Sequence, residues 1–272
     1  MSATTPRSGS GGAVLGWPID DAELRALQHQ LAQRADLARA QDRVVVSGEM
    51  LLGGCFVAFA RGEAGPGHPG DRAWAAAVTW HPTERIRDEG EALRGRSHAR
   101  GPRVARDTAE QVVVRDTVPA PYRAGLLAER EGPILERAVG ALATPPDVLL
   151  VDATGVDHPR RAGLAIHLGA VLGVPTVGVT HRVLRATQPA QPARRRGSSA
   201  PVVLGDEVVG HLVRTRDDAK PVVAHAGWRT DADDAREVVL LASTPASRTP
   251  VPLGEARRVA REARAIASGE WG

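Results

Sequence analysis

Two apolar runs, separated by a segment of helix length, constrain the fold of this chain most. Residues 148–151 are four large apolar residues that end at Asp152, and residues 175–179 form a second run. Short continuous apolar runs are typical of strands buried on both faces of a sheet. A helix predicted at about 162–172 joins them, which favours a strand–helix–strand unit with parallel strands. The chain is therefore expected to be an α/β protein.

Further predicted elements surround this unit. Helices are expected at about 22–40, 126–142, 231–242 and 254–268, and strands at about 55–60, 73–80, 112–114, 202–204, 208–214 and 222–225. Residues 44–46 predict a strand or an extended connection. Early antiparallel strands followed by strand–helix units indicate a mixed sheet with helices on both faces.

The chain is expected to form a single domain over residues 17–268 behind a disordered leader at 1–16. Residues 85–110 carry seven arginines with almost no large apolar residue, which indicates a basic surface insertion. Such an insertion either contacts nucleic acid or is simply a solvated loop.

Composition excludes several classes of protein. The single cysteine, Cys55, rules out an internal disulfide and fits a reducing cytoplasm. No run approaches 18 apolar residues, so we expect no membrane span, and we expect a monomer. The net charge is only +3, and Lys220 is the one lysine among 35 basic residues. Arginine suits phosphate contacts because its planar fork binds two oxygens, although biased composition also explains the preference.

The segment from Val118 to Pro133 and the segment around Asp152 together suggest chemistry. A Pro-Tyr tip leads into a helix that carries Glu131, while Asp152 ends a strand and is followed by a basic loop. Two carboxylates at the ends of adjacent elements, above a basic loop, are typical of metal-assisted phosphodiester chemistry.

These two blocks resemble the endonuclease V family. The resemblance rests on Pro121-Tyr122-x-x-Gly125-Leu126-Leu127 through Arg130-Glu131-Gly132-Pro133, and on Val151-Asp152-x-x-Gly155-x-x-His158-Pro159-Arg160-Arg161-x-Gly163-x-Ala165-x-His167-x-Gly169. It implies a ribonuclease H-like fold and hydrolysis of a phosphodiester on the 3′ side of deoxyinosine in DNA, or near inosine in RNA, as in DNA repair.

The resemblance also implies a magnesium site. Glu131 and Asp152 match two of its acidic residues, and Mg²⁺ prefers such oxygen ligands. A histidine, His181, stands where the family has a catalytic lysine. Phe56 stands where the family's first strand carries an aspartate, and Trp228 stands where the family has a late histidine. We therefore expect weakened magnesium binding and impaired catalysis. A shifted register would instead bring Glu49 near the place of the missing aspartate.

A second set of residues matches the part of the family that holds nucleic acid. Tyr122 and Arg123 match a strand-separating wedge, while Gly125, Leu127 and Ala153 match the pocket for a flipped base, with Ala153 replacing a glycine.

The basic loop after Asp152 adds two candidates. His158 is either a capping residue or a catalyst, and Arg160 is either a phosphate contact or a surface residue. Late in the chain, Asp231 is expected to cap a helix rather than to replace a catalytic group.

Three functional hypotheses follow from these residues. The first is an endonuclease V homologue with a degraded metal site. The second is a pseudoenzyme, a non-catalytic protein that binds inosine-containing nucleic acid through the wedge, pocket and basic loop. The third, which the nearly balanced charge keeps open, is a scaffold with no nucleic-acid role.

Overall fold

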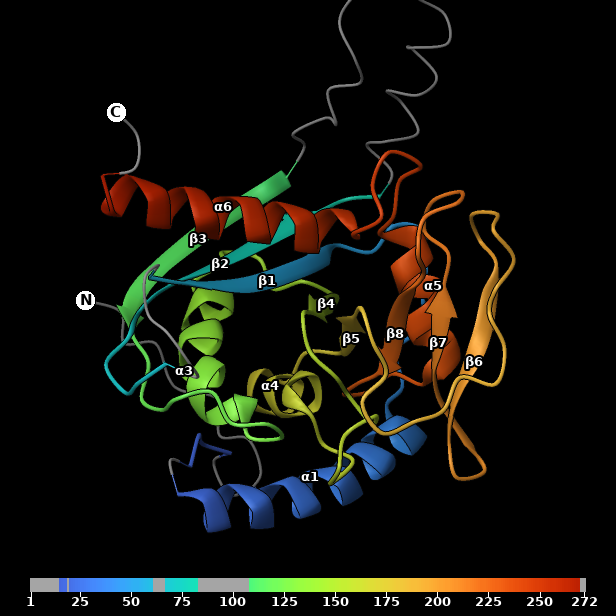
Figure 1. Ribbon diagram of the computed structural model, residues 1–272, viewed down its shortest axis with the longest axis horizontal. Helices are drawn as coiled ribbons and strands as arrows, with labels where there is room; N and C mark the ends of the chain where they lie inside the picture. The colour runs from blue at the N-terminus through green and yellow to red at the C-terminus, as the bar shows by residue number, and fades with distance from the viewer. Residues whose placement is uncertain (1–14, 19, 61–66, 83–107, 270–272) are drawn as a thin grey trace, which may run out of the picture.

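The computed structural model describes residues 15–18, 20–60, 67–82 and 108–269. These residues form one eight-stranded mixed sheet in the order β3-β2-β1-β4-β5-β8-β7-β6 (Figure 1). β1 lies parallel to β4, and β4 lies parallel to β5, whereas every other pair is antiparallel. The carboxyl ends of β1, β4 and β5 therefore meet at one edge of the sheet. The strands are β1 (Leu52–Phe59), β2 (Arg72–Trp80), β3 (Thr108–Thr117), β4 (Val148–Val151), β5 (Thr176–Thr180), β6 (Ser199–Leu204), β7 (Glu207–Val213) and β8 (Val222–Ala226).

Helices cover both faces of the sheet. The helices are α1 (Asp21–Gln41), α3 (Leu127–Gly140), α4 (Leu164–Leu172), α5 (Ala232–Leu241) and α6 (Val251–Ala267). Figure 1 shows α6 across one side of β1–β3 and α3 and α4 on the other side, with α1 packed outside α4. α5 packs on β7 and β8.

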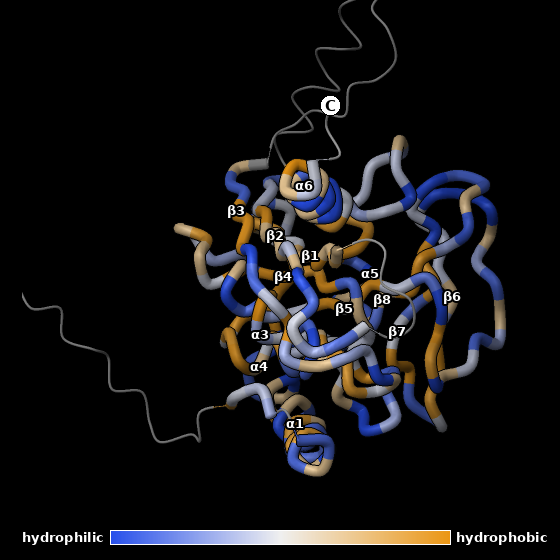
Figure 2. Tube along the Cα trace, turned by 60° about the vertical axis from the view of Figure 1, so that its left-hand side comes forward, coloured by the Kyte–Doolittle hydropathy of each residue, from blue (hydrophilic) through white to orange (hydrophobic). Residues whose placement is uncertain are grey.

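The alternation of side chains along the strands divides the core. Leu149 and Val151 point into a cluster with α3 and α4, whereas Val148 and Leu150 point into a cluster with α5 and the start of α6. Figure 2 shows this apolar interior between the more polar outer faces of the helices. Because β4 is buried on both faces, its sequence is a continuous apolar run rather than an alternating one.

The predicted mixed sheet with helices on both faces is confirmed, although β1, β3 and β6 begin three or four residues earlier than predicted. Residues 44–46 form no strand, and the Val44 N–H donates instead to the Arg229 carbonyl. β1 begins three residues before the predicted strand because Gly53 and Gly54 belong to it. A Cβ at Gly54 would lie 2.3 Å from the Pro252 carbonyl carbon, so the approach of α6 requires glycine there.

Two predictions fall on segments outside the described residues. The leader at 1–16 is described only from residue 15, and the basic insertion at 85–110 only from residue 108. Across the described residues, no helix combines the length and apolarity that a bilayer span requires.

Candidate functional site

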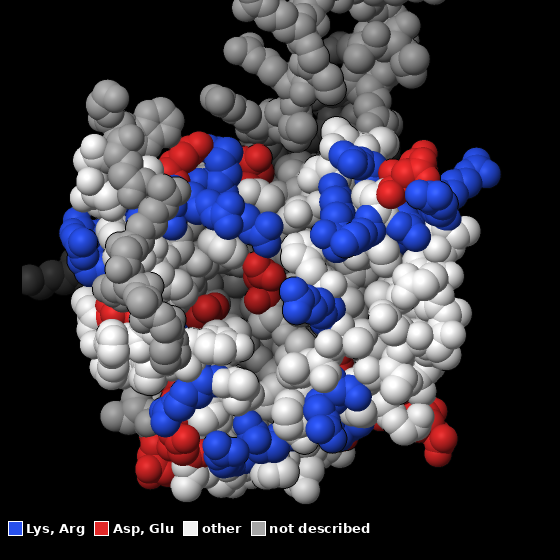
Figure 3. All heavy atoms as spheres, viewed as in Figure 1, with Lys and Arg blue, Asp and Glu red and all other residues white. Residues whose placement is uncertain are grey.

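Glu131 and Asp152, the two predicted carboxylates, line one pocket at the carboxyl edge of the central strands. The cavity has a volume of about 210 Å³, and Glu131 enters it from α3 while Asp152 enters from the end of β4. Figure 3 shows acidic side chains within a hollow on this face and basic side chains around it. The parallel pairing of β1 with β4 explains why this edge collects groups from distant parts of the chain.

Phe56 occupies the wall of this pocket next to Asp152. Cys55 pairs with Val151 in the parallel ladder, so Phe56 is one step further along and adjacent to Asp152. The ring also packs against the apolar face of α6. The position that the resemblance assigns to a metal-binding aspartate therefore holds a hydrocarbon side chain in the wall of the pocket that both carboxylates line.

Arg257 from α6 supplies the positive charge at this place. Its Nη2 donates to Asp152 Oδ2 at 2.9 Å, and its Cζ lies 5.1 Å from the centroid of the Phe56 ring. Arg261, one turn further along α6, places its Cζ 5.7 Å from the same ring. Both distances are within the range of cation–π attraction.

The donor set does not fit a magnesium ion. No cluster of three or more Asp, Glu, His or Cys side chains able to hold a metal exists among the described residues. Mg²⁺ demands near-octahedral oxygen ligands, while Phe56 provides none and the Asp152 carboxylate already pairs with Arg257. The two remaining carboxylates are an incomplete version of the site that the resemblance implied.

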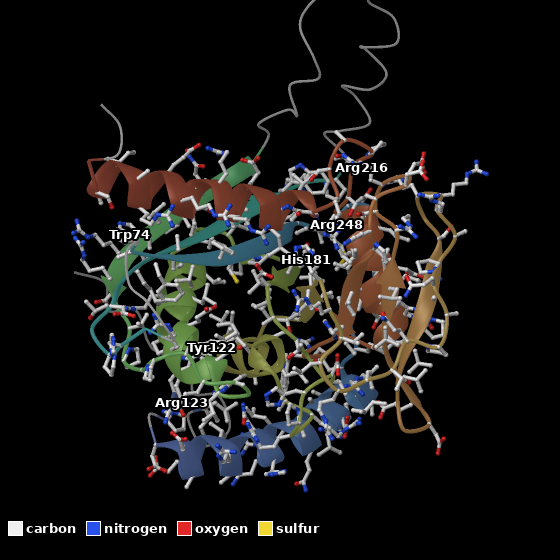
Figure 4. All side chains as sticks on the ribbon, viewed as in Figure 1. Trp74, Tyr122, Arg123, His181, Arg216 and Arg248 are labelled. Carbon is white, nitrogen blue, oxygen red and sulfur yellow. The ribbon has the colours of Figure 1, made fainter. Side chains whose placement is uncertain are left out.

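Burial shapes the electrostatics of this pocket. It raises the pKa of Glu131 to about 8, with the nearby charge of Asp152 adding to the rise and Arg130 opposing it. Burial likewise raises the pKa of the Cys55 thiol, and both carboxylates add to that effect. His181 lies just after β5 with most of its surface exposed. Partial desolvation of its ring, followed by the charge of Arg248, lowers its pKa, while the charge of Asp152 opposes that shift. Figure 4 shows His181 and Arg248 close together.

A second pocket adjoins the first and collects most of the residues predicted to hold nucleic acid. Its volume is about 250 Å³, and Tyr122, with 52% of its surface exposed, lies on its wall. The structure brings these predicted residues together on the pocket wall: Tyr122, Gly125, Leu127, Ala153 and His158. Asp152 borders both pockets, so a group held in one lies next to the other.

The carbonyl of Gly125 anchors the wall of this second pocket. It accepts hydrogen bonds from Gln28 Nε2 at 3.2 Å and from Arg160 Nη2 at 2.6 Å, and it lies 3.2 Å from His158 Nε2. Gly125 has φ +78°, which a side chain would strain. Immediately after it, α3 starts at Leu127 without a side-chain cap, which leaves backbone N–H donors of its first turn beside the pocket.

His158 is a positioning residue in this wall. Its Nδ1 accepts from the Arg160 N–H at 3.3 Å, so its Nε2–H donates to Gly125. Burial, and after it the charge of Arg160, lowers its pKa to about 4, so the ring is neutral near pH 7. With both ring nitrogens bonded within the protein, the structure favours the capping alternative over the catalytic one.

Three predicted contacts are engaged within the protein. Arg123 pairs with Asp21 and donates to Glu129 at 2.5 Å, so its guanidinium is held between α1 and α3. Arg160, for which a phosphate contact and a surface position were the two alternatives, bonds the Gly125 carbonyl and donates to Gln28 at 2.5 Å. The N–H of Ala153 donates to the Val151 carbonyl at 2.8 Å, while its side chain lines the pocket.

One expectation about the metal site is wrong, and the alternative register that would use Glu49 is excluded. β5 and β8 are antiparallel, with Val177 opposite Ala226, so Trp228 lies at the start of β5, at the edge opposite His181. Trp228 therefore removes nothing from the carboxylate pocket. Glu49 lies exposed before β1 begins and cannot replace Phe56, which is near the far end of that strand.

Asp231 is confirmed as a helix cap. It accepts from the Asp234 N–H at 2.8 Å, and Asp234 reciprocates by accepting from the Asp231 N–H at 2.9 Å, which makes a complete capping box.

Sequence reasoning missed two residues of the site. Gln28 comes from the N-terminal helix, 132 residues from Arg160, and Arg257 comes from the C-terminal helix, 105 residues from Asp152. Neither lies in a local motif. The only available signal was that Gln28 interrupts the apolar side of α1, where it is fully buried.

The fold and site define a class of protein before any relative is considered. A ribonuclease H-like mixed sheet with carboxylates at the edge of its central parallel strands is the scaffold of a nuclease. The family model described as Endonuclease V matches residues 103–258. The chain belongs to the endonuclease V family.

Individual relatives agree with this assignment. Endonuclease V of Nocardia farcinica is 46% identical over 160 residues, covering 59% of this chain and 70% of the relative. Endonuclease V of Xanthomonas campestris pv. campestris is 33% identical over 245 residues, covering 90% and 89%. The crystal structure of endonuclease V from Streptomyces avermitilis superposes with a TM-score of 0.74 at 32% identity, covering 93% of this chain and 96% of that chain.

Proposed function

We propose that this protein binds inosine-containing DNA or RNA, with the deaminated base in the pocket beside Tyr122, and that its phosphodiester hydrolysis is impaired. The observation that carries the proposal is the joining of Tyr122, Gly125, Leu127 and Ala153 around one cavity of about 250 Å³. That volume lies slightly below the roughly 300–1,000 Å³ typical of sites for drug-sized ligands, as suits a single base.

The chemistry of the pocket supports a flipped base. The exposed ring of Tyr122 offers a face on which a neighbouring base can stack, and uncapped N–H groups at the start of α3 offer donors to a carbonyl oxygen. Endonuclease V of Ciona intestinalis has been solved in complex with a 24mer DNA containing an inosine followed by a ribo-adenosine. Its chain has the same fold with a TM-score of 0.67 at 19% identity, covering 89% of this chain and 96% of that chain.

The impaired hydrolysis follows from the adjoining pocket. Phe56 replaces a ligand, and Arg257 pairs with Asp152, so a divalent ion has to displace that ion pair and then bind an incomplete set of carboxylates. A second candidate function, slow nicking that needs a divalent metal, is kept by the presence of Glu131 and Asp152 in one cavity.

Parallel binding and nicking assays test the proposal. Strands with and without one inosine, in DNA and in RNA, are incubated with the protein and Mg²⁺ or Mn²⁺. We expect inosine-selective binding with little nicking. Equal affinity for strands with and without inosine would refute the proposed binding. Rapid Mg²⁺-dependent nicking that Asp152→Asn abolishes would refute the impaired hydrolysis. The double variant Phe56→Asp with Arg257→Ala tests the cause of the impaired hydrolysis, because it supplies the missing carboxylate and removes the cation that pairs with Asp152.

A further inference from the structure

The proposed function gives Arg257 of α6 no part in binding nucleic acid, although its guanidinium lies against Asp152, which borders both pockets. It bonds Asp152 at 2.9 Å, and the side chains of Arg257 and Asp152 are 23% and 32% exposed. Within the described part of the chain, Asp152 is the one acceptor that this guanidinium contacts, and its buried Nε has no partner. An arginine fork carries five N–H donors, so Arg257 has capacity for a second acceptor.

The surroundings hold this guanidinium in place. The face of Phe56 lies 5.1 Å from its Cζ on one side, and the Asp152 carboxylate fixes its direction. The ring and the carboxylate together fix the position and the direction of the Arg257 guanidinium. Phe56 thus presents an aromatic face at the position where the resemblance implies a carboxylate, and the Arg257 guanidinium lies over that face.

The local charge favours an anion. Arg261 lies exposed over the same ring, and Arg248 lies near His181 at the rim, where two of its nitrogens donate to the carbonyls of Lys220 and Pro221 at 2.7 Å. Arg257 alone contacts Asp152, while Arg261 lies over the Phe56 ring and Arg248 lies near His181. Figure 3 shows basic side chains around the hollow on this face.

We propose that Arg257 takes the place of a metal ion and binds a backbone phosphate of the nucleic acid directly. This inference rests on the proposed function, because Asp152 borders the base pocket and so places the phosphate next to the bound base. A phosphodiester offers two non-bridging oxygens, which the planar guanidinium of an arginine can bind with two N–H groups without a divalent ion. Binding is then independent of magnesium.

Binding measured in EDTA and in Mg²⁺ tests this inference. With the full chain and a fluorescent inosine-containing strand, we expect the same Kd in both conditions. Arg257→Met weakens binding by about tenfold or more, as loss of a charged hydrogen bond does, and lowers the slope of log K against log salt by about one. Arg257→Lys retains part of the affinity and keeps the test valid if the Met variant folds poorly.

Arg258→Met is the matched control. Arg258 is the next residue of the same helix, but it pairs with Glu255 at 2.9 Å and Glu262 at 2.6 Å. The Arg258→Met substitution should leave unchanged both the Kd and the slope of log K against log salt. Inosine-selective binding that EDTA abolishes, or that Arg257→Met leaves intact, overturns this inference and leaves the proposed function standing. Binding that depends on Arg257 but ignores inosine refutes the proposed function instead and keeps the phosphate contact.

Discussion

The buried imidazole of His167 predicts a specific dependence of stability on pH. His167 lies inside α4 with no exposed surface, its Nε2 is 3.0 Å from the Gly16 carbonyl, and its ring stacks on Trp17 with centroids 4.2 Å apart. Burial lowers its pKa from 6.5 to about 4, although the bond to Gly16 opposes the shift. Replacing it in His167→Gln keeps a donor for Gly16 and removes the titration.

The sign and size follow from proton linkage. Between pH 6.5 and 4 the unfolded chain binds a proton at this residue while the folded protein does not, so the free energy of unfolding falls as pH falls. With pKa values of 6.5 and about 4, the loss between pH 7.5 and pH 5.0 is about 2 kcal/mol from His167 alone. Well above pH 6.5 the imidazole is neutral in both states, so His167 causes no loss in the free energy of unfolding there.

Urea unfolding at both pH values measures this difference. Other buried histidines also contribute to the pH dependence of the parent protein, so the decisive quantity is the change between variants. His167→Gln should reduce the difference between pH 7.5 and pH 5.0 by about 2 kcal/mol. His29→Gln, at an exposed position of α1, should leave it unchanged. An unaltered difference in His167→Gln would show that the imidazole is protonated in the folded protein.

Three further substitutions test the site and its supports. Tyr122→Ala should change the free energy of unfolding by less than about 0.5 kcal/mol because the ring is exposed. The same substitution should weaken binding of an inosine-containing strand, measured by fluorescence anisotropy, by about 1–3 kcal/mol. Unchanged binding would show that Tyr122 does not contact the nucleic acid. Arg130→Met should cost about 3 kcal/mol in urea unfolding, because it removes a buried 2.7 Å ion pair with Asp71, and a loss below 1 kcal/mol would contradict this. Asp157→Asn should cost about 2 kcal/mol, since its carboxylate accepts three backbone N–H bonds from residues 184–186, and an undiminished melting temperature would argue against that role.

Local sequence patterns predicted the elements well because apolar periodicity and caps are local properties. The run 148–151 identified a strand buried on both faces, and Asp20 capped the predicted first helix by accepting from Ala22 and Glu23 N–H groups. β1 was shortened in prediction because paired glycines usually weaken strands, whereas here Gly54 is required by the approach of α6.

The site was predicted in part, and the missing part depended on long-range contacts. Glu131 and Asp152 were placed correctly in one pocket, but the partner that decides their chemistry, Arg257, comes from a different helix. Matching Trp228 to a site residue failed for a related reason. Sequence order does not reveal strand direction, and the antiparallel pairing of β8 carries that residue to the opposite edge.

The three contacts at the Gly125 carbonyl have a thermodynamic consequence. Gln28 and Arg160 fix this peptide from α1 and from the loop after β4, with the His158 ring against it, so the conformation of the pocket wall is settled when the protein folds. A ligand that enters a preorganised wall loses little of its binding free energy to ordering the protein. Affinity then varies with the fit of the base itself, and a single methyl group on the wall, such as that of Ala153, becomes a determinant of which bases are accepted.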